Sequence, residues 1–365
     1  MRAYVPKLDG LRAAAVGLVL IEHFIHGANV ERLGLGGFGV KLFFALSGYL
    51  ITGVFLDARV SSVKTAALNF YWRRLLRLAP ALYIAIIGCA VLNIADMRQD
   101  WWIHALYLTN FKVAIDNHWG PATHFWSLAV EEQFYFVWFA VVILLPQRAL
   151  LPSILVGVFL PTAYQAAFYI AGAEPTFARV LLPECTDYLC MGALLDLERN
   201  TPKRFSAIAD ALRGLPCLVL AAAVVLTIVL ASAAVDSGWF SATLNRFVRM
   251  LLTAILLSHG LSPSSSRLLN QALSFAWVRH LGKISYGIYV YHLFSLSLFT
   301  DVLSIDVHFG LSGKPGTLLA ATIETIISVL LAQLSWSFVE RPVSRFKNIF
   351  SGGSVSETRS VVQTA

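Results

Sequence analysis

The segment from Leu318 to Phe338 reads LLAATIETIISVLLAQLSWSF and carries a single charged side chain, Glu324. About 20 such residues in a helix cross a hydrocarbon core of about 30 Å. A second run of the same length, Leu215 to Val235, carries no charge at all. The whole chain of 365 residues is 57% hydrophobic and 13% charged, whereas soluble domains carry roughly 25% charged residues. The sequence therefore predicts an all-α polytopic membrane protein.

Apolar runs punctuated by proline, glycine and charged residues predict about ten transmembrane helices. The first run contains Glu22 and His23 and is not followed by a small-residue cleavage site, so we expect it to remain as a first span rather than act as a signal peptide. The predicted spans are residues 9–29, 35–56, 79–96, 124–145, 152–171, 178–197, 215–235, 244–261, 283–303 and 315–338.

The net charge of +7 raises the question of nucleic acid, but the basic residues lie in short segments between apolar runs and not along one face. With the N-terminus inside, 20 basic residues fall on cytoplasmic segments and 7 on outer ones. The positive-inside rule then predicts a cell-membrane protein with both termini in the cytoplasm. We expect membrane lipid, not nucleic acid, as its surroundings.

The sequence predicts one membrane domain, residues 1–347, and a disordered cytoplasmic tail rich in serine and glycine, residues 348–365. The longest outer connection, residues 97–123, contains several tryptophans typical of a membrane interface and is a candidate lid. The four cysteines lack the spacing of a metal site and are interpreted as packing residues, and the scattered histidines offer no ligand set, so no metal is expected.

Ionisable side chains inside spans cost at least about 2.5 kcal/mol at the membrane centre, so each is a candidate functional residue. They are Glu22, His23, Lys41, Glu131, Glu132, Asp187, His292 and Glu324.

Arg12 and His23 lie eleven residues apart, which returns to nearly the same face of a helix and separates them by roughly 16 Å. Arg12 is then expected near the cytoplasmic mouth of a cavity and His23 beyond the membrane midplane. The alternative is that His23 is a packed histidine that donates to a backbone carbonyl.

Arg73, Arg74 and Arg77 cluster just before Pro80, a spacing that suits the first turn of the third span. Such a cluster can hold a phosphate-rich ligand at the inner surface. Basic residues at a cytoplasmic helix end also orient a span and contact anionic lipid without any substrate, and that alternative stays open.

Glu131 and Glu132 are adjacent and about 100° apart on a helix, so we expect them to face different points. One is a candidate to orient or charge-balance His23, and the other to bond to a neighbouring helix; the alternative is a purely structural pair. Ser47 lacks the context of a nucleophile elbow. The Ser47-Gly48 pair is more typical of a close helix contact.

Six segments together resemble the acyltransferase-3 family of membrane acyltransferases, and they extend over nearly the whole chain. The segments are Leu8-Asp-Gly-Leu-Arg12 with His23, Phe43-Phe-Ala-Leu-Ser-Gly-Tyr49, Arg73-Arg-Leu-Leu-Arg77, Trp126-Ser-Leu-Ala-Val-Glu-Glu-Gln-Phe-Tyr135, Ile284-Ser-Tyr-Gly-Ile-Tyr-Val-Tyr-His292 and Glu340-Arg-Pro342.

The resemblance implies O-acylation of lipopolysaccharide, exopolysaccharide or another glycan, most often with acetyl-CoA as donor substrate and no permanently bound cofactor. It implies catalytic roles for His23, Glu131 and Glu132, and donor binding by the arginines at 12, 73, 74 and 77. Supporting roles are expected for Asp9, Ser47, Tyr291 and His292.

Two features differ from relatives of this kind. Many members carry an arginine two residues before the acidic position at Asp187, where this chain has Cys185. Some carry a C-terminal hydrolase-like domain, so we expect this chain to complete transfer itself or to hand the acyl group to a polysaccharide assembly partner.

The mechanism that we expect is split across the membrane. The arginines hold the phosphates of acyl-CoA on the inner side, and neutral His23 takes the proton from a sugar hydroxyl as it attacks the thioester. An acyl-histidine intermediate is an alternative. A transporter or flippase for a lipid-linked saccharide and a scaffold for polysaccharide assembly are the competing classes.

Overall fold

The structure is a computed structural model that describes residues 4–25, 30, 33–59, 63–94, 96–120, 122–172, 179–200, 239–261, 267–298, 302 and 313–351. All regular elements within these ranges are helices, so the predicted all-α fold is confirmed. The α-helices are α1 (Pro6–Phe24), α3 (Leu35–Arg59), α4 (Val63–Leu92), α5 (Met97–Ala105), α6 (Thr109–Asp116), α7 (Trp126–Leu144), α8 (Gln147–Ala171), α10 (Leu182–Asn200), α13 (Trp239–Leu261), α14 (Arg267–Ser274), α15 (Ala276–Ser297), α16 (Gly313–Ser335) and α17 (Arg341–Val343).

A described helix overlaps each predicted span except 215–235, which lies outside the described residues. Five helical segments in the described part of the chain are long and apolar enough to cross a membrane. They are Leu35–Arg59, Val63–Leu92, Thr123–Leu144, Gln147–Ala171 and Thr317–Lys347. Helix α1 carries Lys7, Asp9, Arg12 and Glu22 and is more polar than these. The chain is therefore an all-α integral membrane protein whose central helix is unusually charged.

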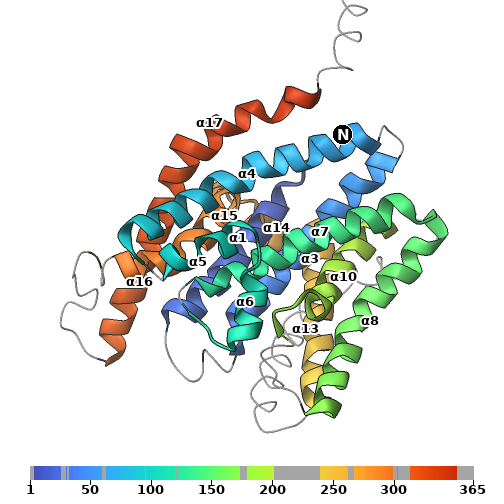
Figure 1. Cartoon of the computed structure of the whole chain (residues 1–365), viewed down its shortest axis with the longest axis horizontal. Coiled ribbons are helices and arrows are strands. Elements are labelled where there is room, and N and C mark those ends of the chain that lie inside the picture. The colour runs from blue at the N-terminus through green and yellow to red at the C-terminus, as the bar shows by residue number, and fades with distance from the viewer. Residues whose placement is uncertain are drawn as a thin grey trace, which may run out of the picture.

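The helices pack in the spatial order α8, α10, α3, α1, α15 and α16, each against the next (Figure 1). Helix α4 packs against α15 and α3, and α7 packs against α3. The core runs along α1, which buries Leu8, Leu11, Val16 and Val19 between its neighbours. Because α1 is central, its polar residues face other helices and not lipid.

Glycines permit the closest helix contacts. A Cβ atom on Gly48 of α3 would overlap the Leu189 carbonyl of α10, and one on Gly192 would overlap the Ala45 carbonyl of α3. A Cβ on Gly282 of α15 would likewise overlap the backbone of Asp9 on α1. Small residues that let backbones approach are typical of helix interfaces in membranes. The close helix contact expected for the Ser47-Gly48 pair is therefore made by Gly48.

Helix α4 begins sixteen residues before the predicted start of the third span, at Val63 instead of residue 79. The arginine cluster therefore lies within the helix, and Pro80 is an interior residue and not part of a first turn. An interior proline removes one backbone hydrogen bond, which neighbouring helices of membrane proteins can offset. The Tyr291 hydroxyl of α15 donates to the Ala81 carbonyl, 3.2 Å away, close to this point.

The candidate lid, residues 97–123, folds as α5 and α6, followed by the 3₁₀ turn Thr123–Phe125 that leads into α7. Trp101, Trp102 and Trp119 are exposed, as expected at an interface. At the other end of the chain, α16 continues through the π-helical turn Trp336–Glu340 into α17 and the 3₁₀ helix η4 (Ser344–Ser351). Helix η4 thus extends past residue 348, where the tail is predicted to begin.

A buried ion-pair group joins α10 to α13. Arg246 of α13 donates through Nε to Asp187 Oδ2 at 2.6 Å and through Nη1 to Glu184 Oε1 at 2.5 Å. Asp187 is fully buried, and the Arg246 side chain is 6% exposed. Asp187 thus pairs with an arginine of another helix, while Cys185 stands where many members of the resembled family carry an arginine.

Candidate active site

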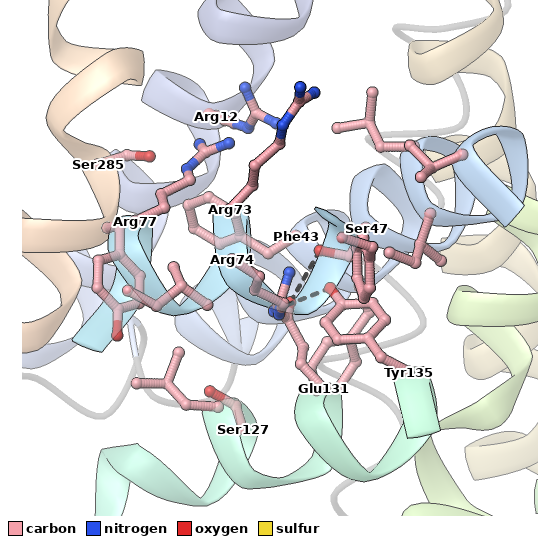
Figure 2. Close-up of a pocket in the computed structure, with 18 of the residues that line it drawn as sticks. Arg12, Phe43, Ser47, Arg73, Arg74, Arg77, Ser127, Glu131, Tyr135 and Ser285 are labelled. Carbon is pink, nitrogen blue, oxygen red and sulfur yellow. Dashed lines mark hydrogen bonds and ion pairs between the residues drawn. The ribbon is translucent and has the colours of Figure 1, made fainter. Parts of the chain in front are cut away.

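A cavity of about 540 Å³ opens between α1, α3, α4, α7 and α15. Residues from five of the six motif segments line this cavity. Its wall also contains aromatic rings, including those of Phe43, Phe44 and Phe70. The predicted site residues in its wall are Arg12, Arg73, Arg74, Arg77, Ser47 and Glu131. Figure 2 shows these side chains around one space.

Arg12, Arg73 and Arg77 gather on one side of this cavity (Figure 2). Arg12 donates to Asp9 Oδ1 at 2.9 Å, and the buried Asp9 also accepts a hydrogen bond from the Tyr4 hydroxyl. Asp9 therefore holds Arg12 in place from behind. Arg73 Nε donates to the Lys347 carbonyl of η4 at 3.3 Å, which joins the C-terminal segment to the arginine cluster.

Arg74 points to the other side, toward Glu131 (Figure 2). Its Nε lies 2.5 Å from Glu132 Oε1, its Nη2 lies 3.6 Å from Glu131 Oε2, and its guanidinium stacks 3.8 Å above the Tyr135 ring. Contrary to expectation, the two adjacent carboxylates approach one partner. The reason is that the guanidinium is broad and presents separate nitrogens to each of them.

Both carboxylate oxygens of Glu131 accept a hydrogen bond. It accepts hydrogen bonds from Ser47 Oγ at 3.0 Å and from the Tyr135 hydroxyl at 3.2 Å. Within the described part of the chain, the hydrogen bonds and ion pairs of Glu131 and Glu132 are thus with Arg74, Ser47 and Tyr135, and not with His23. Ser47 acts here as a hydrogen-bond donor to a carboxylate.

His23 lies beyond the cavity wall, at the last turn of α1. Its Nδ1 lies 2.9 Å from the Val19 carbonyl. A carbonyl only accepts, so Nδ1 carries the proton and Nε2 carries a free lone pair. The packed arrangement weighed from the sequence is therefore present, and it leaves the nitrogen that a general base needs unprotonated.

Two further histidines surround this position. The His23 ring lies 5.0 Å from the His292 ring of α15, and the His292 ring lies 5.0 Å from that of His124. His292 is fully buried and His124 is 5% exposed. Sequence reasoning predicted His292 as a supporting residue and missed His124. In the sequence, the only feature that points to His124 is its position at the polar start of an otherwise apolar span.

A pair of hydroxyls lies between the cavity and these histidines. Ser127 Oγ and the Tyr289 hydroxyl are 2.7 Å apart, both line the cavity, and the Tyr289 hydroxyl donates to the His124 carbonyl at 2.8 Å. The Tyr289 ring also lies 5.5 Å from the His292 ring. Ser127 and Tyr289 therefore connect the cavity that holds the arginines to the group of histidines.

Tyr291, the remaining predicted supporting residue, faces away from the cavity. Besides Ala81, its hydroxyl donates to Ser335 Oγ at 2.9 Å, and Ser335 donates to Glu340 Oε1 at 2.8 Å. These bonds fix the π-helical end of α16 against α4. Within the described ranges, no group of three or more histidine, cysteine, aspartate or glutamate side chains is placed to hold a metal ion.

An all-α membrane bundle with a cavity that holds arginines on one side and a carboxylate pair on the other defines a membrane protein with an internal polar site. The acyltransferase domain model of the acyltransferase-3 family matches residues 5–336. The chain therefore belongs to this family.

Curated relatives extend beyond the region that they share with this chain. The peptidoglycan O-acetyltransferase OatA of Listeria monocytogenes is 29% identical over 96% of this chain and 58% of its own length. YrhL of Bacillus subtilis is 30% identical over 93% and 55%. The O-acetyltransferase OatA of Staphylococcus aureus is 27% identical over 94% and 57%. This chain thus spans a little over half the length of these relatives. No solved structure matches it.

Proposed function

We propose that this protein is a membrane O-acetyltransferase that moves an acetyl group from cytoplasmic acetyl-CoA to a hydroxyl of a cell-surface glycan. The observation that carries the proposal is the cavity itself, which joins the arginines of α1 and α4 to the level of Ser127 and Tyr289. A thioester donor suits this space because its phosphates need cations while its pantetheine arm is narrow and carries no charge.

Donor binding falls to Arg12, Arg73 and Arg77. Their guanidinium groups gather at one side of the cavity, where bidentate bonds to phosphate oxygens are favourable. Arg74 differs because two carboxylates already neutralise it. We assign Arg74 to holding the wall of the site, with Glu131 and Glu132 as its partners, and not to direct phosphate binding.

The chemical step falls to His23. Its Nε2 removes the proton from the acceptor hydroxyl as the oxygen attacks the thioester carbonyl, the C–S bond breaks, and the proton is returned to the departing thiolate. A neutral imidazole with a fixed Nδ1–H is suited to this role. The products are the acetylated glycan and the free CoA thiol, and the step needs no bound cofactor.

The acceptor class follows from the relatives. Because the Listeria protein bears the name peptidoglycan O-acetyltransferase, peptidoglycan strands are the first acceptor to test, ahead of lipopolysaccharide or exopolysaccharide. We infer that this chain, which corresponds to the region shared with these relatives, carries out the transfer within the membrane. The acceptor and His23 then lie on the outer side of the membrane.

The test is acceptor-dependent release of CoA thiol by the purified protein in liposomes, with acetyl-CoA and soluble glycan fragments. His23→Ala should lower the rate by about 10²–10⁴-fold, since general base catalysis contributes that much. The matched control is His259→Ala, because His259 is another helix histidine whose Nδ1 bonds to a carbonyl four residues before it, that of Ile255, as His23 does to Val19. It should stay within threefold of the native rate.

The competing reading as a transporter or flippase for a lipid-linked saccharide makes the opposite prediction. It expects saccharide to cross the liposome membrane without acetyl-CoA and without release of thiol. Saccharide transport in that assay, with no thiol above background, would reject the enzyme assignment.

A further inference from the structure

His292 has an arrangement that the proposed reaction leaves unused. Its Nδ1 lies 2.7 Å from the Tyr289 carbonyl and must donate to it. Its Nε2 is therefore an unprotonated acceptor, yet it is buried and has no hydrogen-bond partner among the described residues. Buried polar atoms are nearly always paired, so an orphan of this kind calls for a functional explanation.

The same tautomer logic applies to its neighbour. His23 also donates through Nδ1 to a carbonyl and keeps a lone pair on Nε2. Two acceptors cannot bond to each other, but they can share one added proton. The centroids of the His23 and His292 rings are 5.0 Å apart and the ring planes meet at 70°, so the two rings are in direct edge contact.

Other titratable groups around the pair are already engaged. His124 donates through Nε2 to the Val290 carbonyl, and Glu22 accepts from the Gly36 amide. Arg249 of α13 donates to the carbonyls of Leu33 and Gly34. Glu324 of α16 is likewise not without an interaction partner. Ser295, one turn beyond His292, donates to the His292 carbonyl. Among these groups, His292 Nε2 is the acceptor that lacks a hydrogen bond, and its ring is in contact with that of His23.

We propose that His23 and His292 form a proton-sharing pair, in which the proton taken from the acceptor hydroxyl is held between their two Nε2 atoms. This inference rests on the proposed function, in which His23 is the base. In the step, the O–H bond of the acceptor breaks, an N–H bond forms at His23, and His292 accepts the hydrogen bond from it. The proton later leaves with the CoA thiol. His292 is a positioning residue, because it acts through His23.

The pair makes the imidazolium of His23 easier to form, because the partly buried His23 lies against the fully buried His292. A charge without a partner inside a protein is costly, and a hydrogen bond to a charged group is worth about 1.5–3 kcal/mol. His292 offers that bond without adding a charge of its own. A carboxylate in the same place would instead leave a buried anion whenever His23 is neutral.

The first test is the pH dependence of the turnover rate. His292→Phe keeps an aromatic ring but removes the acceptor, so kcat should fall at least tenfold, KM for acetyl-CoA should change less than threefold, and the acidic limb of the profile should move to lower pH. His259→Phe removes an equally buried histidine with the same bond to a helix carbonyl and should leave the profile unchanged. An unchanged profile in His292→Phe would overturn the pair.

The second measurement does not depend on activity, so it separates failure of the pair from failure of the proposed function. In the full chain with nitrogen-15 histidine, the ring signals of His23 and His292 should respond to one shared protonation step. In His23→Gln that response of His292 should disappear, while the signals of His259 stay as they were. If His292 remains unaffected while His23 is protonated in the native protein, the proposal is wrong.

Discussion

Arg74 and Arg77 lie three residues apart on α4, and their surroundings give them different roles. Arg74 is held by Glu131 and Glu132 and stacks on the Tyr135 ring. Arg77 lines the cavity and has no hydrogen bond or ion pair to any residue in the described ranges. The side chain that looks most strongly bound in the structure is thus the one least suited to bind a phosphate.

A pair of substitutions should separate these roles. Arg77→Gln should reduce the rise in melting temperature caused by CoA, because ligand linkage is lost, and should leave the ligand-free protein nearly unchanged. Arg74→Gln should lower the melting temperature of the ligand-free protein, since it leaves two partly buried carboxylates without their cation. Thermal unfolding with and without CoA measures both effects.

Two controls make this comparison sharp. Arg148→Gln removes an exposed arginine outside the cavity and should change neither quantity. Arg74→Gln combined with Glu132→Gln should recover part of the lost stability, because the unpaired carboxylate is removed as well. Equal loss of the CoA-induced rise in melting temperature in Arg148→Gln and Arg77→Gln would mean that the arginine cluster only orients the helix and contacts anionic lipid.

At the scale of the element, the segment of residues 97–123 is held by local polar contacts and contains a strained turn. Asn110 of α6 and Gln133 of α7 form two reciprocal amide bonds of 3.0 and 2.9 Å. Tyr107, between α5 and α6, has a positive φ of 56°, which is uncommon for a bulky residue. The segment is thus fixed to α7 beside Glu132, and strain at such a turn often accompanies a functional position.

The stability of this segment should depend on pH through His104. Burial is the main cause that lowers the pKa of His104 from 6.5 to about 4. Between these values the opened segment binds a proton that the folded one does not, so stability is complete above pH 6.5 and is lost as the pH falls. The loss amounts to about 3 kcal/mol at pH 4.

Hydrogen exchange of residues 97–116 measures this loss. Amide protection, corrected for intrinsic rates, should be clearly weaker at pH 5 than at pH 7. His104→Leu should remove the difference, whereas His118→Leu, at an exposed position of the same outer connection, should retain it. Equal protection of the native segment at both pH values would contradict the assignment.

At the scale of the whole molecule, the proposed reaction requires two separate entrances. The charge distribution predicts that the α7–α8 connection is cytoplasmic and that α6 lies outside. Between them, the cavity extends from the arginines of α4 to Ser127 at the start of α7. Donor and acceptor would then approach from opposite sides of the membrane.

Thiol labelling tests this arrangement in a variant in which alanine replaces all four native cysteines. A cysteine in place of the exposed Arg148 should react with a membrane-impermeant reagent only from the cytoplasmic side. One in place of Ile115, which is 75% exposed on α6, should react only from the outer side. Acetyl-CoA sealed inside vesicles should then acetylate glycan supplied outside. Transfer that requires both substrates in one compartment would reject the two-sided mechanism.

The sequence by itself determined the membrane class, the helical fold and the positions of nearly all described helices. It could do so because the length of an apolar run and its local periodicity are properties of neighbouring residues. The start of α4 was missed because its first residues are a polar extension of the apolar span. The motif residues were also found from the sequence, since polar side chains in apolar runs are conspicuous.

Only the tertiary structure decided which of these residues meet. Arg74 finds Glu132 across 58 residues, and His124 bonds to Val290 across 166. Asp187 receives its arginine from α13 and not from its own helix. No local pattern encodes such partners, because they depend on how separate helices pack. For the same reason the structure, and not the spacing of Arg12 and His23, placed His292 beside the proposed base.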